Sequence, residues 1–258
     1  MAWILQHYLG QFLVFTLVLS RIGGLLMTAP VFGSAEVPIR IRGLLAFALA
    51  LLIAPMQTMK LASEPHTLVD FGLLVAGESL IGLTIGVGIT MLFSGVQVAG
   101  QVVSQMSGLQ MADVYNPGFD ANVPIFSQLL YYVALGVFVI IDGHRRVMGA
   151  VLDTFAWLPP GGSGMPASIT ETLTTLIAQS FLLGIKAAAP AMAALLLATL
   201  VLGLVSRTLP QLNIMSVGFG FSSMITLGAL SVSLGTAVWA FQDQVEPALT
   251  ALLEALRG

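Results

Sequence analysis

Six long apolar blocks constrain the fold of this chain more than any other feature of its sequence. The blocks are continuous, are rich in Leu, Ala, Met and Gly, and lack a period-two alternation of apolar and polar residues. Such alternation would indicate half-buried strands, whereas long unbroken apolar runs are typical of helices. The sequence therefore predicts an all-α protein. The blocks are Leu9–Ala29, Leu44–Met59, Phe71–Gly100, Leu129–Ile141, Phe181–Val205 and Ile214–Phe241.

The scarcity of charge indicates what surrounds these helices. Of the 258 residues, 57% are hydrophobic and 8% are charged, whereas a soluble domain carries roughly 25% charged residues. So few charges cannot cover a globule of this size in water. The composition predicts an integral membrane protein in contact with lipid, or a subunit buried among equally apolar partners. The net charge of −3 and the lone basic pair Arg145-Arg146 argue against binding of nucleic acid, which needs several cations on one face.

The lengths of the blocks argue against a conventional six-span bundle. A membrane-spanning helix needs about 20 apolar residues. As a helix, Phe71–Gly100 would reach about 45 Å and Leu129–Ile141 only about 20 Å. Leu44–Met59 is short and is interrupted by Pro55. Helices of such lengths suit burial against other protein chains, so we expect membrane-associated helical hairpins packed in a hetero-oligomeric assembly.

Small residues recur at every fourth position in two of the blocks. Residues four apart lie on one face of a helix, and small side chains there let two backbones approach closely. Because Gly costs about 1 kcal/mol in an exposed helix, this spacing favours helices that press against neighbours. Simple tolerance of Gly in membrane helices is the alternative. The residues are Ser20, Gly24 and Thr28 in the first block, and Gly82, Gly86, Gly95 and Ala99 in the third.

A polar, turn-rich segment, Ser104–Ser127, separates the third and fourth blocks. It contains the turn signature Asn116-Pro117-Gly118. Unstructured connections longer than about 12–15 residues are usually functional or disordered, and disorder would expose several large apolar side chains here. We interpret the segment as a loop folded back between two apolar arms and occupying a cavity or pore; an ordinary surface loop is the alternative. Its candidate site residues are Met106, Leu109, Met111, Val114, Tyr115, Asn116, Pro117, Gly118 and Phe119.

Three charged residues, Arg21, Glu78 and Lys186, lie within apolar blocks. A charge inside a membrane is costly and usually faces a partner or a wet cavity. We expect Glu78 to pair with Arg21 or with Lys186 as a buried structural ion pair that holds helices in register. A proton or ion relay is the alternative interpretation, but one carboxylate near two cations makes a poor proton chain.

The longest connection after the fourth block contains a Pro/Gly-rich stretch at Pro159–Gly164, which we interpret as a possible hinge between a helical N-terminal part and a C-terminal helical hairpin. The pattern Ser168-x-x-Glu171 predicts a capping box at the start of a helix that leads into the fifth block. Neither side of the hinge has a charged surface of its own. We therefore expect residues 1–258 to form a single domain.

No catalytic or metal-binding pattern stands out in the sequence. His7, His66 and His144 are far apart and lie in no zinc-binding pattern. Gly218-x-Gly220-x-x-Ser223 is a near miss to a dinucleotide fingerprint, but it lies in an apolar run without the strand that such a site requires. We therefore expect no enzyme activity, no cofactor and no metal.

Taken in order, several short motifs resemble the FliR family, a component of the flagellar type III export gate whose injectisome counterpart is SctT. The resemblance covers nearly the whole chain, and the order and spacing of the motifs make it specific. One departure is Asp142, where the family more often has Asn. The motifs are Arg21–Leu26, Ala29–Gly33, Val37–Arg42, Ala54-Pro55, Glu78–Gly86, Gln97–Gly100, Gln105–Leu109, Asp142–His144, Phe155 and Leu158-Pro159.

This resemblance implies a structural, channel-forming subunit in the bacterial inner membrane at the flagellar basal body. It implies assembly with FliP and FliQ, with FlhB and FlhA nearby, and export of unfolded flagellar subunits. It also implies that the loop at about Met106–Pro124 is a plug that closes the channel. An injectisome gate subunit of the SctT type is the first alternative. A small-molecule secondary transporter is the second, because broken, Gly- and Pro-rich helices fit that class too.

Overall fold

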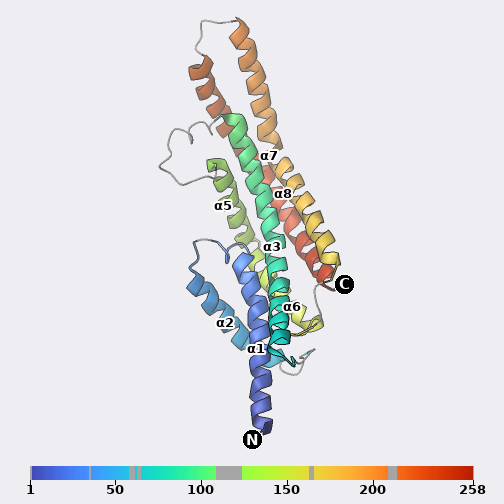
Figure 1. Cartoon of the computed structure of the whole chain (residues 1–258). Helices are drawn as coiled ribbons and strands as arrows, with labels where there is room; N and C mark the ends of the chain where they lie inside the picture. Colours follow the sequence, from blue (N-terminus) through green and yellow to red (C-terminus); the bar gives the residue numbers. More distant parts are fainter. Residues whose placement is uncertain are drawn as a thin grey trace. The chain divides into compact units, whose positions relative to one another are not determined.

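The computed structural model describes residues 2–34, 36–57, 62, 65–108, 124–162, 166–208 and 214–257 (Figure 1). Within these ranges the chain is helical with turns between the helices and no strand, which confirms the all-α prediction. The helices are α1 (Ala2–Thr28), α2 (Ile39–Gln57), α3 (Leu68–Ser107), α5 (Ile125–Ile140), α6 (Gly143–Trp157), α7 (Ser168–Thr208) and α8 (Ile214–Arg257).

Five of the described helices are long and apolar enough to cross a membrane. The helices α5 and α6 are bent by 64° at their junction and would add a sixth span if they act as one. The three longest helices extend at least ten residues beyond their apolar blocks, because polar flanking residues are helical as well. The 40 residues of α3, the 41 of α7 and the 44 of α8 reach about 60–66 Å, roughly twice the hydrocarbon thickness of a bilayer.

Two of these boundaries bear on the sequence expectations. The helix α7 begins at Ser168, where the capping box was predicted, but the hydroxyl of Ser168 donates to the carbonyl of Ala255 at 2.8 Å. A reciprocal capping box instead opens α3, where the Thr67 hydroxyl accepts from the amide of Asp70 at 3.1 Å and the Asp70 carboxylate accepts from the amide of Thr67 at 3.0 Å. Pro55 does not break α2, because it lies in the last turn.

The chain divides into two compact units, and the first comprises Met1–Met91, Asp142–Leu176 and Val245–Gly258. In this unit α1 and the beginning of α3 run side by side in the same direction, since residues near Gly24 meet those near Ser79 and residues near Thr28 meet those near Gly86. The helix α2 packs on α1. The core of the unit consists of side chains that are almost fully inaccessible: Leu17, Ile22, Leu25, Ile85, Ile89, Val151 and Phe155.

The second unit comprises Leu92–Ile141 and Ile177–Gln244. Its centre is a cluster of aromatic rings around Phe93, which lies edge-on to Phe138 and Phe241 with ring centroids 5.4 Å and 4.9 Å apart. Tyr131 joins the cluster at 5.7 Å from Phe93. Aromatic pairs in this geometry add about 0.5–1.5 kcal/mol each beyond the area that they bury. Rings from α3, α5 and α8 therefore hold the unit together.

A proline within α7 ties this helix to α8 in the second unit. Pro190 lies in the interior of α7, and a proline there disrupts the regular pattern of backbone hydrogen bonds. The amide of the next residue, Ala191, donates to the hydroxyl of Ser233 in α8 at 3.1 Å. Ser and Thr side chains of neighbouring helices commonly bind backbone groups near a proline. The contact joins α7 to α8 at the residue after the proline.

Candidate functional site

A buried ion pair joins α1 and α3 in the first unit. The Nε atom of Arg21 lies 2.6 Å from Oε2 of Glu78, and the two side chains are 0% and 2% exposed. The parallel packing of α1 on α3 brings these residues together. Buried charges are tolerated when they are paired and when their remaining hydrogen-bonding capacity is satisfied.

Two further segments complete the environment of this pair. From α6, the hydroxyl of Thr154 accepts from Nη1 of Arg21 at 2.9 Å, and the ring of Phe155 lies 4.2 Å from the guanidinium carbon. After α6, the carbonyl of Leu158 accepts from the same Nη1 at 3.0 Å. The amide of Gly161 donates to Oε1 of Glu78 at 2.9 Å. We call Arg21, Glu78, Thr154, Phe155 and Gly161 the Arg–Glu centre.

The turn at Gly161 is part of this centre because of its backbone conformation. Gly161 has φ of +78°, a region that glycine adopts without strain, and this conformation accompanies the bond from its amide to Glu78. The amide of Gly162 donates to the carbonyl of Pro159 at 3.0 Å, and the amide of Ala62 donates to that of Pro160 at 3.1 Å. Residues 159–162 therefore form a fixed turn. A hinge over 159–164 stays a prediction, since residues 163–165 lie outside the described ranges.

The chemistry available to the Arg–Glu centre is structural. Both oxygens of Glu78 accept hydrogen bonds, and the guanidinium of Arg21 can only donate them. Nη2 of Arg21 is buried without a hydrogen-bond partner in the described residues. A pair that is enclosed and bonded to three segments of the first unit suits a clamp between α1, α3 and α6 better than a route for protons.

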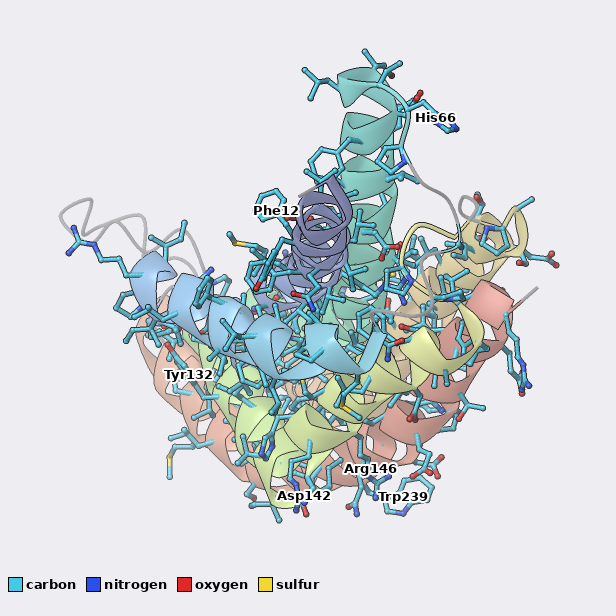
Figure 2. All side chains as sticks on the ribbon, turned by 90° about the horizontal axis from the view of Figure 1, so that it is seen from below. Phe12, His66, Tyr132, Asp142, Arg146 and Trp239 are labelled. Carbon is cyan, nitrogen blue, oxygen red and sulfur yellow. The ribbon has the colours of Figure 1, made fainter. Side chains whose placement is uncertain are left out.

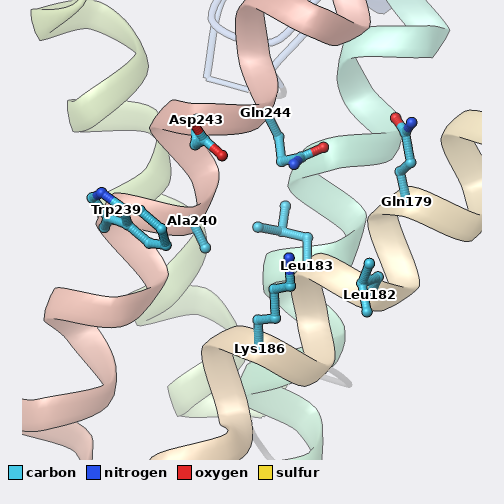
Figure 3. Close-up of a pocket in the computed structure, with 8 residues that line it drawn as sticks. All are labelled: Gln179, Leu182, Leu183, Lys186, Trp239, Ala240, Asp243 and Gln244. Carbon is cyan, nitrogen blue, oxygen red and sulfur yellow. The ribbon is translucent and has the colours of Figure 1, made fainter.

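Lys186 is not part of this centre, and its role as a buried charge stays a prediction. It lies in α7, in the second unit, and its side chain is exposed. In Figure 3 it points into the space between α7 and α8. The apolar run around it suggested burial, but the described residues leave this face of α7 uncovered.

The three glycines expected at helix contacts all lie against a neighbouring backbone. A Cβ atom added at Gly82 would overlap the carbonyl oxygen of Arg21, and one at Gly86 would overlap the hydroxyl of Thr28. A Cβ at Gly95, in the second unit, would overlap the carbonyl oxygen of Ser180. In contrast, a Cβ at Gly77 in the same helix would meet nothing within 4 Å.

The two helices that flank the predicted plug contact each other closely in the second unit. A Cβ at Gly100 of α3 would overlap the backbone of Ser127 in α5, and the hydroxyl of Ser127 donates to the carbonyl of Gln97 at 2.8 Å. Met106 is half-buried near the end of α3. The other candidate loop residues lie outside the described ranges: Leu109, Met111, Val114, Tyr115, Asn116, Pro117, Gly118 and Phe119.

Comparison with known proteins identifies the family. A family model described as bacterial export proteins, family 1, matches residues 12–248. The flagellar biosynthetic protein FliR of Caulobacter vibrioides is 30% identical over 235 residues, which cover 91% of this chain and 93% of that protein. FliR of Escherichia coli is 30% identical over 214 residues, covering 83% and 81%, and FliR of Bacillus subtilis is 29% identical over 236 residues, covering 89% of each.

The chain belongs to the FliR family of bacterial export proteins. Membership of this family, together with the apolar helices, makes it a membrane protein that takes part in export for flagellar biosynthesis. The family is one of transport components and not of enzymes. Among the described residues, no group of three His, Asp or Glu side chains could hold a metal ion.

The structure also explains the residue at which this FliR-family chain departs from the usual pattern. Asp142 joins α5 to α6 with φ of +58°, in the left-handed region. Asn and Asp adopt this conformation more readily than other residues with a side chain, so either suits the bend. Figure 2 shows Asp142 near Arg146 on the outer surface, where the carboxylate of Asp142 lies 3.9 Å from Arg145 and Arg146 pairs with Glu246.

Sequence inspection missed three members of the Arg–Glu centre. Thr154 and Phe155 are one turn before the Leu158-Pro159 motif and are uncharged, so nothing in their local sequence points to Arg21. Gly161 was interpreted as a source of flexibility, although its amide binds Glu78. The periodicity of α6 could have pointed to Thr154 and Phe155, because it places them on the buried face with Val151.

Proposed function

We propose that this chain is a structural, channel-forming subunit of the flagellar type III protein export gate in the bacterial inner membrane. The observation that carries the proposal is the family match over residues 12–248, with relatives named as flagellar biosynthetic proteins. Those names favour the flagellar role over an injectisome gate. The substrates in this role are unfolded flagellar subunits.

Partner subunits of the FliP and FliQ type would supply the cover that the apolar helices lack. In the most apolar 18-residue stretch of α7, 22% of the residues are buried within the chain, compared with 61% in the corresponding stretch of α3. Leu197, Leu200 and Leu204 on α7 are each more than half exposed. Apolar surface of this extent marks contact with lipid or protein. We infer that FliP and FliQ homologues cover it, with FlhB and FlhA beside the assembled gate.

The plug of this gate would be the segment at about Met106–Pro124. Its support is the contact between α3 and α5 at Gly100 and Ser127, which holds the two ends of the segment in one unit. A loop tied at both ends by neighbouring helices is restricted in reach. In the proposed mechanism it fills the channel at rest and an entering chain displaces it.

The test is to express the chain alone and together with the FliP and FliQ homologues of the same organism. We expect the chain alone to aggregate after extraction in mild detergent, because its exposed apolar helices have no protein cover. With both partners it should elute as one monodisperse complex in size-exclusion chromatography. Co-expression with an unrelated multi-span membrane protein is the control. A chain that is monodisperse alone and does not co-elute with either homologue contradicts the proposal.

A further inference from the structure

A small hollow between α7 and α8 in the second unit collects polar side chains at the margin of the apolar runs of the two helices. It has a volume of about 50 Å³ and is bordered by Gln179 and Lys186 from α7 and by Trp239, Asp243 and Gln244 from α8 (Figure 3). Within the described part of the chain, none of the four polar side chains has a hydrogen bond or an ion pair. A cation, an anion and two amides thus face one hollow without partners in this chain.

The surroundings make this arrangement costly as soon as the surface is covered. The apolar run of residues 187–206 follows Lys186 directly in α7. A charged group that loses water needs an opposite charge or several hydrogen bonds. Lys186 and Asp243 have opposite charges, and no ion pair joins them in the described residues. An occupant that brings an acid for Lys186 and a base for Asp243 would compensate both charges, while the two amides can pair with either.

The face of α8 that leads to the hollow is exposed and contains two glycines. Gly228, Val232, Gly235, Trp239 and Asp243 follow one another at intervals of three or four residues and so lie on one face of α8. All five are exposed, with Val232 and Trp239 at 60% and 69%. We call these five residues the α8 stripe.

The two glycines of the α8 stripe differ from the three α3 glycines that lie at helix contacts. Cβ atoms at Gly82, Gly86 and Gly95 would overlap a neighbouring helix, whereas Cβ atoms at Gly228 and Gly235 would meet nothing within 4 Å. The contact glycines of α3 therefore already have a close neighbour in this chain, whereas those of the α8 stripe have space for one. Lipid acyl chains can adapt to a side chain of any size, whereas a second helix backbone can approach closely only where the side chains are small.

We propose that the groove between α7 and α8 docks an apolar helix of a partner subunit, which carries an acid and a base that pair with Lys186 and Asp243. This inference rests on the proposed function, because a gate assembly supplies such a helix. The open glycines set how closely the partner approaches, and the two charges set its register. A phospholipid is the competing occupant.

The first test compares variants of this chain in the complex with the FliP and FliQ homologues. Gly235→Leu fills the open face and should lower co-elution at least tenfold. Gly136→Leu is the matched control, because Gly136 is also open and exposed but lies in α5 and not on the α8 stripe. Both changes add a helix-favouring side chain to free space, so both variants should reach wild-type levels in the membrane. Lys186→Glu should also lower co-elution at least tenfold, and Lys186→Arg should restore it.

The second test identifies the occupant by replacing Trp239 with a photo-crosslinking phenylalanine analogue in the wild-type complex. The inference expects an adduct with one of the two co-expressed homologues, at a helix that contains an acid and a base. Lipid adducts alone would overturn the inference and leave the proposed function intact. So would co-elution of the Gly235→Leu and Lys186→Glu variants at the level of the wild-type chain. Failure of the wild-type chain to co-elute would instead overturn the proposed function.

Discussion

At the scale of single residues, the Arg–Glu centre shows why a charged pair persists inside an apolar protein. Arg21 binds Glu78 and Thr154, and Glu78 in turn accepts from the amide of Gly161. These bonds join α1, α3, α6 and the turn after α6. Breaking such a pair leaves one charge buried without compensation, which costs far more than the pair itself contributes.

The residue-scale prediction compares this buried pair with an exposed one. Glu78→Gln should lower the free energy of unfolding by about 3 kcal/mol, because Arg21 loses its counter-charge. The control Arg146→Gln breaks the exposed pair with Glu246 and should cost less than about 1 kcal/mol. The measurement is thermal unfolding of the purified complex in detergent. If Glu78→Gln assembled with full stability but did not export, a relay role would replace the clamp.

At the scale of elements, α3 is the helix on which both units depend. It contributes residues up to Met91 to the first unit and Leu92 onward to the second. Its Gly82 and Gly86 lie against α1, Gly95 lies against α7 and Gly100 lies against α5. The spacing of small residues predicted close packing of this helix, and it could not predict the neighbour at each glycine, because any helix backbone can occupy such a site.

The element-scale prediction concerns the contact between α1 and α3. Gly82→Ala should separate the two helices and destabilise the protein by about 1–3 kcal/mol, the usual range for overpacking. Gly77→Ala, where the added Cβ meets open space, should be neutral or stabilise by about 0.5–1 kcal/mol. Thermal unfolding of the two variants in parallel measures the difference. Equal midpoints of thermal unfolding for the two variants would show that the α1–α3 contact is looser than described.

At the scale of the whole molecule, the long helices leave a large apolar surface for other subunits. Three described helices are about twice as long as a bilayer is thick, and α7 is largely uncovered. Because polar flanks account for part of these lengths, the stronger observation is the uncovered apolar surface of α7. That surface supports the proposed gate assembly, in which the loop between α3 and α5 is the proposed closure.

The whole-molecule prediction tests this closure in the assembled complex. Deletion of residues 116–122 should raise ion conductance through the complex reconstituted in planar bilayers, because the proposed plug is shortened while the flanking helices remain. The wild-type complex at the same protein density is the reference, and co-elution of the variant with its partners shows that assembly survives. Unchanged conductance in an intact complex would argue against the plug.

The sequence by itself determined the helical class, the membrane environment, the family and the positions of the small residues and of Arg21 and Glu78. These depend on composition, local periodicity and the order of short motifs, which are properties of the chain read in one dimension. The tertiary structure decided that Glu78 pairs with Arg21 and not with Lys186, and that Thr154, Phe155 and Gly161 surround the pair. It also decided that Lys186 is exposed, because burial depends on which distant helix covers a face, and no local pattern specifies that neighbour.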